Sequence, residues 1–437
     1  MLLDTILPNS SIAGIYLAVV FIILLSLLVF RQKKQTLLVK ILSVGFAVLL
    51  FYSKSRAGWV ACSTSVLYLS LQQRTGNQLK NIIVAFLLLI LFIFSVSVFY
   101  KPGSSIGRLH VYSVSANILK SNWVNGVGVG KFKAVFNEHQ ANYFSTGNID
   151  GGRALLADNT FYAFNEYLQW IIETGVTGFL ILTIAIGFLW RRSILLQREK
   201  GNMPLLMAAK SSFICIMVAS LFSYPLHTIP FQFVTLGCVG VLLFYPLEKH
   251  DQSSFFNLLT GTIRTLFLLL CIYFFVNTYF HIKGKIAEKE AFELQKIGYK
   301  TEALEKYKQL TQSFHRHGYN YYSYAERLYF ANRLEEAELA IEKCQRHYVD
   351  NNVYKLKAQI ETELGKYMDA EQSYLRAVYM VPNRMGSRYD LMNFYISRGD
   401  TNNAKHWANS VLHMPVKVPS ERTAIMLKAT EDSLLKW

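Results

Sequence analysis

Long apolar runs crowd residues 12 to 282 of this 437-residue chain and stop there. Because a helix needs about 20 apolar residues to cross the hydrocarbon of a bilayer, runs near that length are candidate membrane spans. Eight runs qualify, the third being short and rich in Ser and Thr: 12–30, 36–52, 57–71, 82–100, 167–190, 205–223, 231–246 and 265–282. The sequence therefore predicts an all-α fold, with a polytopic transmembrane bundle of about eight spans in residues 1–282 and a separate domain in residues 283–437.

The short connections between these runs differ in charge, which predicts how the spans are oriented. Cytoplasmic loops near span ends retain Lys and Arg. Alternate connections hold most of these residues, whereas the other short turns hold only Lys54 and Arg56, with none in residues 224–230. We therefore expect the N-terminus, the long loop 101–166 and residues 283–437 on the outer side. This topology explains the formal charge of +16 better than nucleic acid binding does, so no nucleic acid partner is predicted. The predicted cytoplasmic charges are Arg31, Lys33, Lys34, Arg74, Lys80, Arg191, Arg192, Arg198, Lys200, Lys249 and Arg264.

The five cysteines provide no framework for disulfides or for a metal. Cys62, Cys215, Cys238 and Cys271 lie inside apolar runs, where a thiol behaves as a small hydrophobe, and Cys344 stands alone in the C-terminal part. No C-x-x-C spacing occurs among them. The sequence thus predicts neither a metal site nor a cofactor.

A polar, helical pattern with an internal period begins after residue 282. A glycine or asparagine followed five residues later by alanine recurs at intervals of 34, 33 and 34 residues, and a bulky or small apolar residue follows each alanine by four places. This pattern resembles the tetratricopeptide repeat, in which a small alanine lets paired helices pack closely. We expect residues 283–437 to form a tetratricopeptide α-solenoid with a concave surface for a protein or peptide partner. The repeated positions are Gly298, Asn332, Gly365 and Gly399; Ala303, Ala337, Ala370 and Ala404; and Tyr307, Ile341, Tyr374 and Ala408.

The loop 101–166 is far longer than the usual connection of a few residues, and long loops on a rigid scaffold commonly carry function. It contains Gly126, Gly128 and Gly130 at alternate positions, followed by Lys131. Such a turn can bring backbone N–H groups close to phosphate oxygens. A plain flexible turn explains the same spacing, because no strand of a nucleotide-binding sheet precedes it.

Arg56 lies at the outer mouth of two predicted spans, in the turn that also holds Lys54. A guanidinium can engage a diphosphate bidentately, whereas a lysine offers only a point charge. Arg108, in the outer loop, would supply a second such donor. The alternative interpretation is that both arginines anchor on the headgroups of membrane lipid.

Polar side chains follow one face of the helix that is predicted to lead into the fifth span. Asn165, Gln169 and Glu173 are four residues apart, and Glu166 lies beside the first of them. Polar residues inside a span are costly and usually face a cavity or the interior of the bundle. These residues are therefore candidates for substrate binding or catalysis, although an interhelical structural hydrogen bond explains Glu173 nearly as well.

Over roughly residues 1–246 the chain resembles the O-antigen ligase superfamily, which also includes O-antigen polymerases and protein O-oligosaccharyltransferases. The resemblance implies a glycosyltransferase of the bacterial inner membrane that takes a glycan from undecaprenyl diphosphate on the periplasmic face. The acceptor in such proteins is lipid A core, a growing polymer or a protein hydroxyl. A C-terminal tetratricopeptide domain, here expected in the periplasm, is a known accompaniment. The resemblance rests on the segment 8–17, Ser55-Arg56, Gly107-Arg108, the stretch 126–132, Asn165-Glu-Tyr-Leu-Gln169 and Glu173-x-Gly175.

The resemblance also implies roles for particular residues. Arg56 and Arg108 would hold and neutralise the departing diphosphate, so that no metal is needed. Loop 101–166 would close over the glycan and position the acceptor hydroxyl. The residues expected to contact substrate are Lys54, Gly126, Gly128, Gly130, Lys131, Asn165, Gln169 and Glu173.

Two features differ from the family pattern. Many ligases have a histidine, expected to be the general base, where this chain has Phe164, which cannot carry a proton. His110, His139, Glu166 and His227 are the candidates to replace it; a histidine titrates near neutrality, but a lone one at a membrane interface is more often structural. The family also has several spans before its early motif, so we expect a truncated copy or a misassigned start. Both features keep open the alternative of a non-catalytic membrane scaffold that recruits envelope assembly partners through its repeats.

Overall fold

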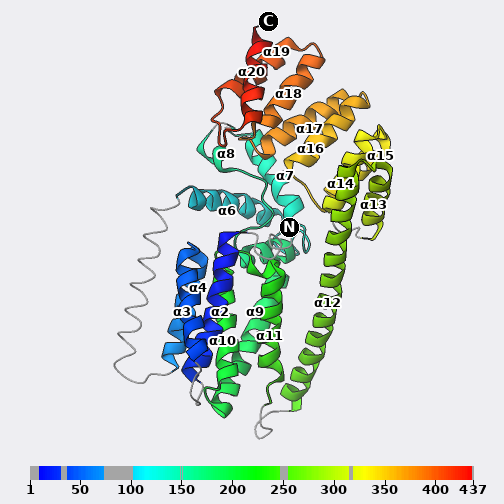
Figure 1. Ribbon diagram of the computed structural model, residues 1–437. Coiled ribbons are helices and arrows are strands. Elements are labelled where there is room, and N and C mark those ends of the chain that lie inside the picture. Colours follow the sequence, from blue (N-terminus) through cyan, green and yellow to red (C-terminus); the bar gives the residue numbers. More distant parts are fainter. Residues whose placement is uncertain are drawn as a thin grey trace. The chain divides into compact units, whose positions relative to one another are not determined.

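The computed structural model describes residues 9–30, 37–72, 102–147, 149, 151–246, 254–313 and 318–435, and every regular element in those ranges is a helix. The prediction of an all-α protein is therefore confirmed (Figure 1). Two compact units divide the chain, and each is described by itself. The first contains residues 1–102, 163–171 and 176–279, and the second contains residues 103–162, 172–175 and 280–437.

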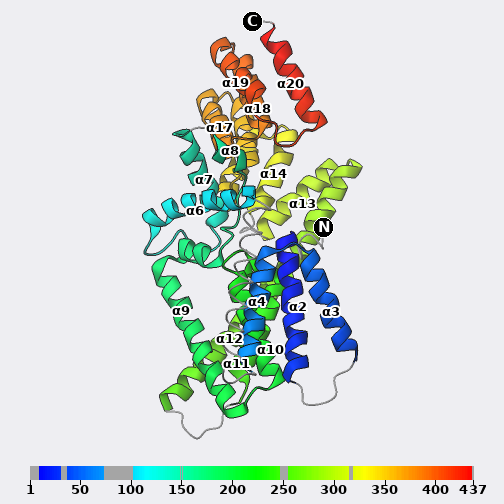
Figure 2. The same ribbon diagram turned by 90° about the vertical axis from the view of Figure 1, so that its left-hand side faces the viewer.

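The first unit is a bundle of apolar helices. Helices α2, α4 and α10 pack against one another, α3 packs on α2, and α11 packs on α10 (Figures 1 and 2). The helix α9 belongs mainly to this unit, as does the first part of α12. The bounds are α2 Ser10–Phe30, α3 Leu37–Tyr52, α4 Arg56–Leu71, α9 Glu166–Lys200, α10 Pro204–Ala219, the short 3-10 helix η1 Pro225–His227, α11 Ile229–Phe244 and α12 Ser254–Ile297.

Helices α2 and α4 approach each other closely at two glycines. A Cβ added to Gly14 would lie 2.1 Å from Cβ of Ser55, and one added to Gly58 would lie 2.8 Å from the backbone of Gly14. Small residues of this kind let helix backbones approach in apolar bundles. The crossing fixes the start of α4, where Arg56 lies, against the first turn of α2.

Three described helices are long and apolar enough to cross a membrane: Ser10–Phe30, Glu166–Lys200 and Leu258–Ile297. The segments Leu37–Tyr52, Pro204–Ala219 and Ile229–Phe244 are shorter apolar helices. The predicted run 57–71 falls in α4, and the run 82–100 lies outside the described residues. The count of about eight spans and their orientation therefore stay predictions.

The second unit contains the repeats, and the solenoid prediction is confirmed. Helices pair in sequence, α14 with α15, α16 with α17 and α18 with α19 (Figure 1). The end of α12 packs on α13 through Ala291, Tyr307 and Leu310. The bounds are α13 Lys300–Ser313, α14 Gly318–Phe330, α15 Leu334–Gln345, α16 Asn351–Glu363, α17 Tyr367–Met380, α18 Met385–Ser397, α19 Thr401–His413 and α20 Glu421–Leu434.

Each repeat turns at its predicted glycine or asparagine. These four residues have positive φ angles, of 104°, 56°, 75° and 72° in chain order. At each turn the next residue donates its backbone N–H to a carbonyl five residues back, at 2.8 to 3.0 Å, which is the Schellman pattern that ends a helix. The four repeat alanines are at most 1% exposed, so helices can pack against each of them. The turn residues are Gly298, Asn332, Gly365 and Gly399.

Most of the long loop packs against the solenoid within the second unit. It forms α6 (Pro102–Asn122), α7 (Phe132–Ser145) and α8 (Gly152–Leu156), and α7 packs on α17. The side chain of Asn137 donates to Val349 O at 2.7 Å, and that of Gln140 donates to Met380 O at 2.6 Å. Asn383 donates to three carbonyls of the segment 154–157, at 2.6 to 3.0 Å.

This grouping differs from the sequence-based division, which assigned 101–166 to the membrane part and began a new domain at residue 283. The loop carries amide and carboxylate groups that complement the repeats, and spacing alone does not reveal such pairing. No break occurs at the predicted boundary either, since α12 is one helix from Ser254 to Ile297. The transition from apolar to polar sequence therefore falls inside a helix.

The strain at a repeat turn gives a stability prediction. Gly365 has φ of 75° and open space around it, so Gly365→Ala should destabilise the solenoid only through the left-handed backbone, by about 1 to 2 kcal/mol. Hydrogen exchange of α16 and α17 amides in the full-length protein would measure this loss. The matched control is Gly386→Ala, where the added Cβ would lie 3.7 Å from Lys355 Nζ, an ordinary contact. Equal exchange in the two variants would contradict the prediction.

Candidate active site

A buried glutamate and a histidine form a pair at one end of the first unit. Glu166 is the first residue of α9, whose N-cap is Asn165; the Asn165 side chain accepts from Leu168 N–H at 3.0 Å. His227 ends η1, in the turn between α10 and α11. Its Nδ1 lies 2.8 Å from Oε2 of Glu166, and Oε1 of Glu166 accepts from Leu226 N–H at 2.7 Å. The glutamate side chain is 9% exposed and the histidine side chain 33%, so the imidazole is the member that faces outward.

The neighbouring Gln169 fixes where the proton sits on His227. Oε1 of Gln169 accepts from Ala163 N–H at 3.1 Å, which leaves its Nε2 pointing to Nε2 of His227 at 3.0 Å. An amide nitrogen can only donate, so His227 Nε2 is the acceptor and Nδ1 carries the proton toward Glu166. This tautomer follows from the hydrogen-bond pattern. The hydrogen-bond pattern is that of a neutral imidazole whose Nε2 accepts from the Gln169 amide.

The turn that carries Arg56 lies at the same end of this bundle. Ser55 caps α4, accepting from Gly58 N–H at 3.1 Å and donating to Ser11 O at 3.0 Å. The hydroxyl of Ser11 is 3.5 Å from that of Ser223, which precedes the histidine turn by two residues. Ser11 thus lies between the turn 53–56 and the turn 223–228. Lys54 has φ of 52° and is exposed, and Arg56 is half-buried as the first residue of α4.

The residue at the family's histidine position packs on the same turn. Phe164 has φ of 54°, and its ring meets that of Tyr224 edge to face at 5.7 Å between centroids. Tyr224 accepts from the side chain of Asn9 at 2.6 Å and lies three residues before His227. The sequence interpretation did not single out Asn9, Ser11 or Tyr224 as site residues, because polar residues at the ends of apolar runs are common.

The glycine turn binds a carboxylate of its own chain within the second unit. Val127 and Gly128 donate their N–H groups to the carbonyls of Ile172 and Glu173, at 2.9 and 2.8 Å. The Glu173 carboxylate accepts from Gly130 N–H at 2.8 Å and from Phe132 N–H at 3.4 Å. These amides are engaged internally beside a negative charge, which argues against the predicted phosphate role. The structural interpretation of Glu173 is the better supported one.

A close backbone approach explains why glycines are needed here. A Cβ on Gly126 would lie 2.4 Å from the carbonyl carbon of Glu173, and one on Gly175 would lie 2.0 Å from Val124 O. Gly175 has φ of 67° and interrupts α9 with a kink. Lys131 is the N-cap position of α7 and is exposed.

His110 is buried within the second unit. It is 3% exposed, between the rings of Tyr143 and Phe144, and its Nε2 is 3.0 Å from Oε1 of Gln140. The Gln140 amide nitrogen donates to two carbonyls, so its oxygen faces the histidine and Nε2 of His110 carries the proton. Nδ1 has no hydrogen-bond partner among the described residues. Burial, as the largest cause, lowers the pKa of His110.

The other two second-unit candidates are partly exposed. His139 is half-buried, and burial lowers its pKa while the neighbouring Glu138 opposes that shift. Arg108 is half-buried on α6, close enough to Tyr112 to oppose the burial that raises the pKa of that phenol. Because Arg56 and Arg108 fall in different units, their joint grip on a diphosphate stays a prediction.

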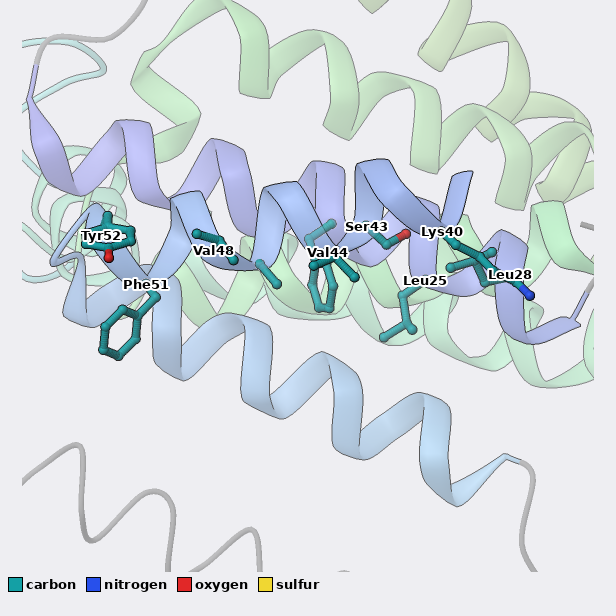
Figure 3. A pocket seen from close by; sticks show the side chains of 10 residues that line it. Leu25, Leu28, Lys40, Ser43, Val44, Val48, Phe51 and Tyr52 are labelled. Atoms are coloured by element: carbon teal, nitrogen blue, oxygen red, sulfur yellow. The ribbon is translucent and has the colours of Figure 1, made fainter. Parts of the chain in front are cut away.

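An apolar groove runs along α2 and α3 in the first unit, and Figure 3 shows its lining side chains. Its volume is about 700 Å³. It extends from Lys40 to Tyr52 along α3, so it ends two residues before Lys54 and four before Arg56. The groove suits a hydrocarbon chain. Among the described residues no cluster of three or more His, Cys, Asp and Glu side chains is placed to hold a metal.

Residues 2–183 match the model of a family described as O-Antigen ligase. This part of the chain is similar to the O-antigen ligase family. The resemblance inferred from the sequence is therefore confirmed over these residues, which are less than half of the chain. The matched segment includes Arg56, Arg108, Glu166 and Gln169, and His227 lies beyond it. A ligase-type glycan transfer is the general activity that this match supports.

No curated protein matches the chain. Among solved structures, MamA is 14% identical, with 35% of this chain and 81% of that one covered and a TM-score of 0.28. YrrB, described as a TPR protein with an unusual peptide-binding site, is 16% identical, with 33% and 84% covered and a TM-score of 0.27. Yeast Tom70 is 10% identical, with 90% and 85% covered and a TM-score of 0.31. At these TM-scores the likeness supports no statement about function.

The lowered pKa of His110 gives a prediction about pH. The folded state holds this imidazole neutral below its ordinary pKa of 6.5, while the unfolded chain takes up a proton there. The second unit should therefore lose stability as the pH falls below 6.5, and this loss should be smaller in His110→Phe. Hydrogen exchange of α6 and α7 amides at pH 5.5 and 7.5, corrected for intrinsic rates, measures it. His406→Ala, at an exposed site on α19, is the control and should keep the parent's pH dependence; an unchanged dependence in His110→Phe would refute the assignment.

Proposed function

We propose that this protein transfers a glycan from undecaprenyl diphosphate, on the periplasmic face of the bacterial inner membrane, to an acceptor hydroxyl. The observation that carries the proposal is the oriented Glu166–His227 pair, at the bundle end where the turn of Arg56 also lies. The match of residues 2–183 to the O-antigen ligase family supports the reaction class. Lipid A core, a growing polysaccharide and a protein hydroxyl are the acceptors consistent with that class.

His227 is the general base in this proposal. Its Nε2 takes the proton of the acceptor hydroxyl as the acceptor oxygen bonds to the anomeric carbon of the glycan. Glu166 holds Nδ1–H and stabilises the imidazolium that forms, as a buried carboxylate does in other histidine-based sites. Gln169 occupies Nε2 in this structure, so the acceptor hydroxyl must displace its amide. In this proposal the general base comes from the turn between α10 and α11, because Phe164 cannot carry a proton.

Arg56 stabilises the negative charge that develops on the departing diphosphate. The bond between the anomeric carbon and the diphosphate oxygen breaks, and the diphosphate leaves with an additional negative charge. A guanidinium can bind two phosphate oxygens at once and needs no metal to do so. The apolar groove supports this placement, because a polyprenyl chain lying along α3 would present its headgroup near Lys54 and Arg56.

Substitutions at the three assigned groups test the mechanism. His227→Ala, Glu166→Gln and Arg56→Ala should each reduce glycan transfer, by about a hundredfold or more for the loss of the base. Arg56→Lys should recover only part of the activity, because an ammonium is a point charge. The measurement is surface glycan on gels from the native host, with membrane levels of each variant confirmed by immunoblot. His406→Ala is the control, and unchanged banding in His227→Ala and Arg56→Ala together would eliminate the proposal.

A non-catalytic scaffold is the second candidate, favoured by the solenoid and by Phe164 at the family's histidine position. The two candidates separate in the same experiment. A scaffold requires the repeats but not the proton-transfer pair, so it should tolerate Glu166→Gln with no change in the surface glycan. Loss of glycan in that conservative variant favours the enzyme.

The proposed periplasmic side of the solenoid can be tested by labelling. Met368 is 80% exposed on α17, and Arg198 is exposed near the end of α9, in a connection predicted to be cytoplasmic. A membrane-impermeant maleimide should label Met368→Cys in intact spheroplasts, and Arg198→Cys only after permeabilisation. The parent chain with its five native cysteines sets the background. The reverse pattern would show that the orientation is inverted.

A further inference from the structure

The second unit contains an acidic pocket of about 640 Å³ between α15, α16 and α17. Its lining includes four carboxylates, from Glu338, Glu342, Glu361 and Asp369. An acidic pocket is unexpected on a chain whose formal charge is +16. The negative charge of its lining therefore favours a positively charged ligand.

Glu361 is the unusual member of this group. The residue is 3% exposed, and its Oε2 has no hydrogen-bond partner among the described residues. Its Oε1 lies 3.3 Å from Lys357 Nζ, a long contact for an ion pair. Leaving a charged oxygen buried without a partner costs free energy that a donor entering the pocket would recover.

The cations that line the pocket are already engaged. Lys357 contacts Glu361, and Arg376 donates from Nε to the Glu138 carboxylate at 2.9 Å. Lys366, outside the lining, pairs with Glu338 at 2.6 Å. The negative charge of the pocket is therefore not neutralised by these three cations alone.

Tyr354 and Tyr379 also line the pocket, and Lys357 Nζ lies 6.0 Å from the centroid of the Tyr354 ring. The hydroxyl of Tyr354 donates to Glu138 at 2.6 Å, which holds its ring in place. A guanidinium stacks on aromatic faces and forms paired hydrogen bonds with a carboxylate. An arginine side chain fits this combination of carboxylates and rings better than a compact, strongly hydrated ammonium does.

We propose that this pocket binds an arginine side chain from a basic segment of a protein partner, with Glu361 as the central acceptor. Two N–H groups of the incoming guanidinium would reach the Glu361 carboxylate, and Glu342 and Asp369 would attract the segment electrostatically. The proposal does not depend on glycan transfer, because it concerns only the repeats and α7.

Peptide binding to the full-length protein in detergent micelles tests the proposal. The probes are three fluorescein-labelled octapeptides, in which glycine alternates with arginine in the first, with lysine in the second and with glutamate in the third. Their binding is measured by fluorescence polarisation. The arginine peptide should bind saturably and most tightly, the lysine peptide more weakly and the glutamate peptide not at all. Glu361→Gln should weaken the binding of the arginine peptide about tenfold or more, because charge-assisted hydrogen bonds are lost.

Two further variants keep this test decisive. Glu342 is exposed, so Glu342→Gln should leave the fold intact. This variant should weaken binding of the arginine peptide by a smaller factor than Glu361→Gln does. Glu335→Gln, exposed on the same helix α15 and outside the pocket lining, is the matched control and should bind as the parent does. Unchanged hydrogen exchange of α16 and α17 amides establishes that Glu361→Gln is folded. Absence of saturable binding, or equal affinity in Glu361→Gln, Glu342→Gln and Glu335→Gln, would overturn the proposal.

Discussion

The close crossing of α2 and α4 at Gly14 is the constraint on which the candidate active site depends. Only a glycine lets Ser55 come near enough to donate to the carbonyl of Ser11, and that bond holds the turn carrying Arg56. The Ser11 hydroxyl, 3.5 Å from that of Ser223, lies beside the turn that carries His227. Groups from segments more than 200 residues apart thus gather at one end of an apolar bundle. Polar groups in such surroundings are stable only when they are paired, which favours this compact cluster.

The second unit joins the long loop to the repeats through side-chain amides and an ion pair. Asn137 and Gln140 of α7 donate to carbonyls of the solenoid, and Glu138 pairs with Arg376. A buried carbonyl without a partner is costly, so each of these bonds fixes the loop where it packs. Part of the solenoid surface therefore serves the chain's own loop, and the acidic pocket beside it is the part proposed for an outside partner. This arrangement makes deletion of the repeats an ambiguous test of catalysis, because it would also remove the packing partner of the loop.

The repeats were the most predictable part of the chain, and the glycine turn was among the least. Gly298, Asn332, Gly365 and Gly399 were identified by period alone, because each repeat must reverse its helix through a left-handed residue. The glycines at 126–130 carry the same conformational signal, yet their amides bind Glu173, more than 40 residues away. A spacing rule shows that a turn is tight but not which oxygen it binds. For the same reason Glu166 and His227 were separate candidates in the sequence, and only the fold brought them to 2.8 Å.

The sequence by itself determined that the chain is helical, that its apolar part differs from its repeats, and that roughly residues 1–246 resemble an O-antigen ligase; the family match confirmed this resemblance over residues 2–183. These properties depend on local periodicity and composition, which can be read from neighbouring residues in the sequence. The tertiary structure decided the tautomer of His227, the contact of buried His110 with Gln140, the membership of loop 103–162 in the second unit and the unpartnered oxygen of Glu361. Each of these depends on hydrogen-bond geometry between residues distant in the chain, and such geometry exists only once the helices have packed.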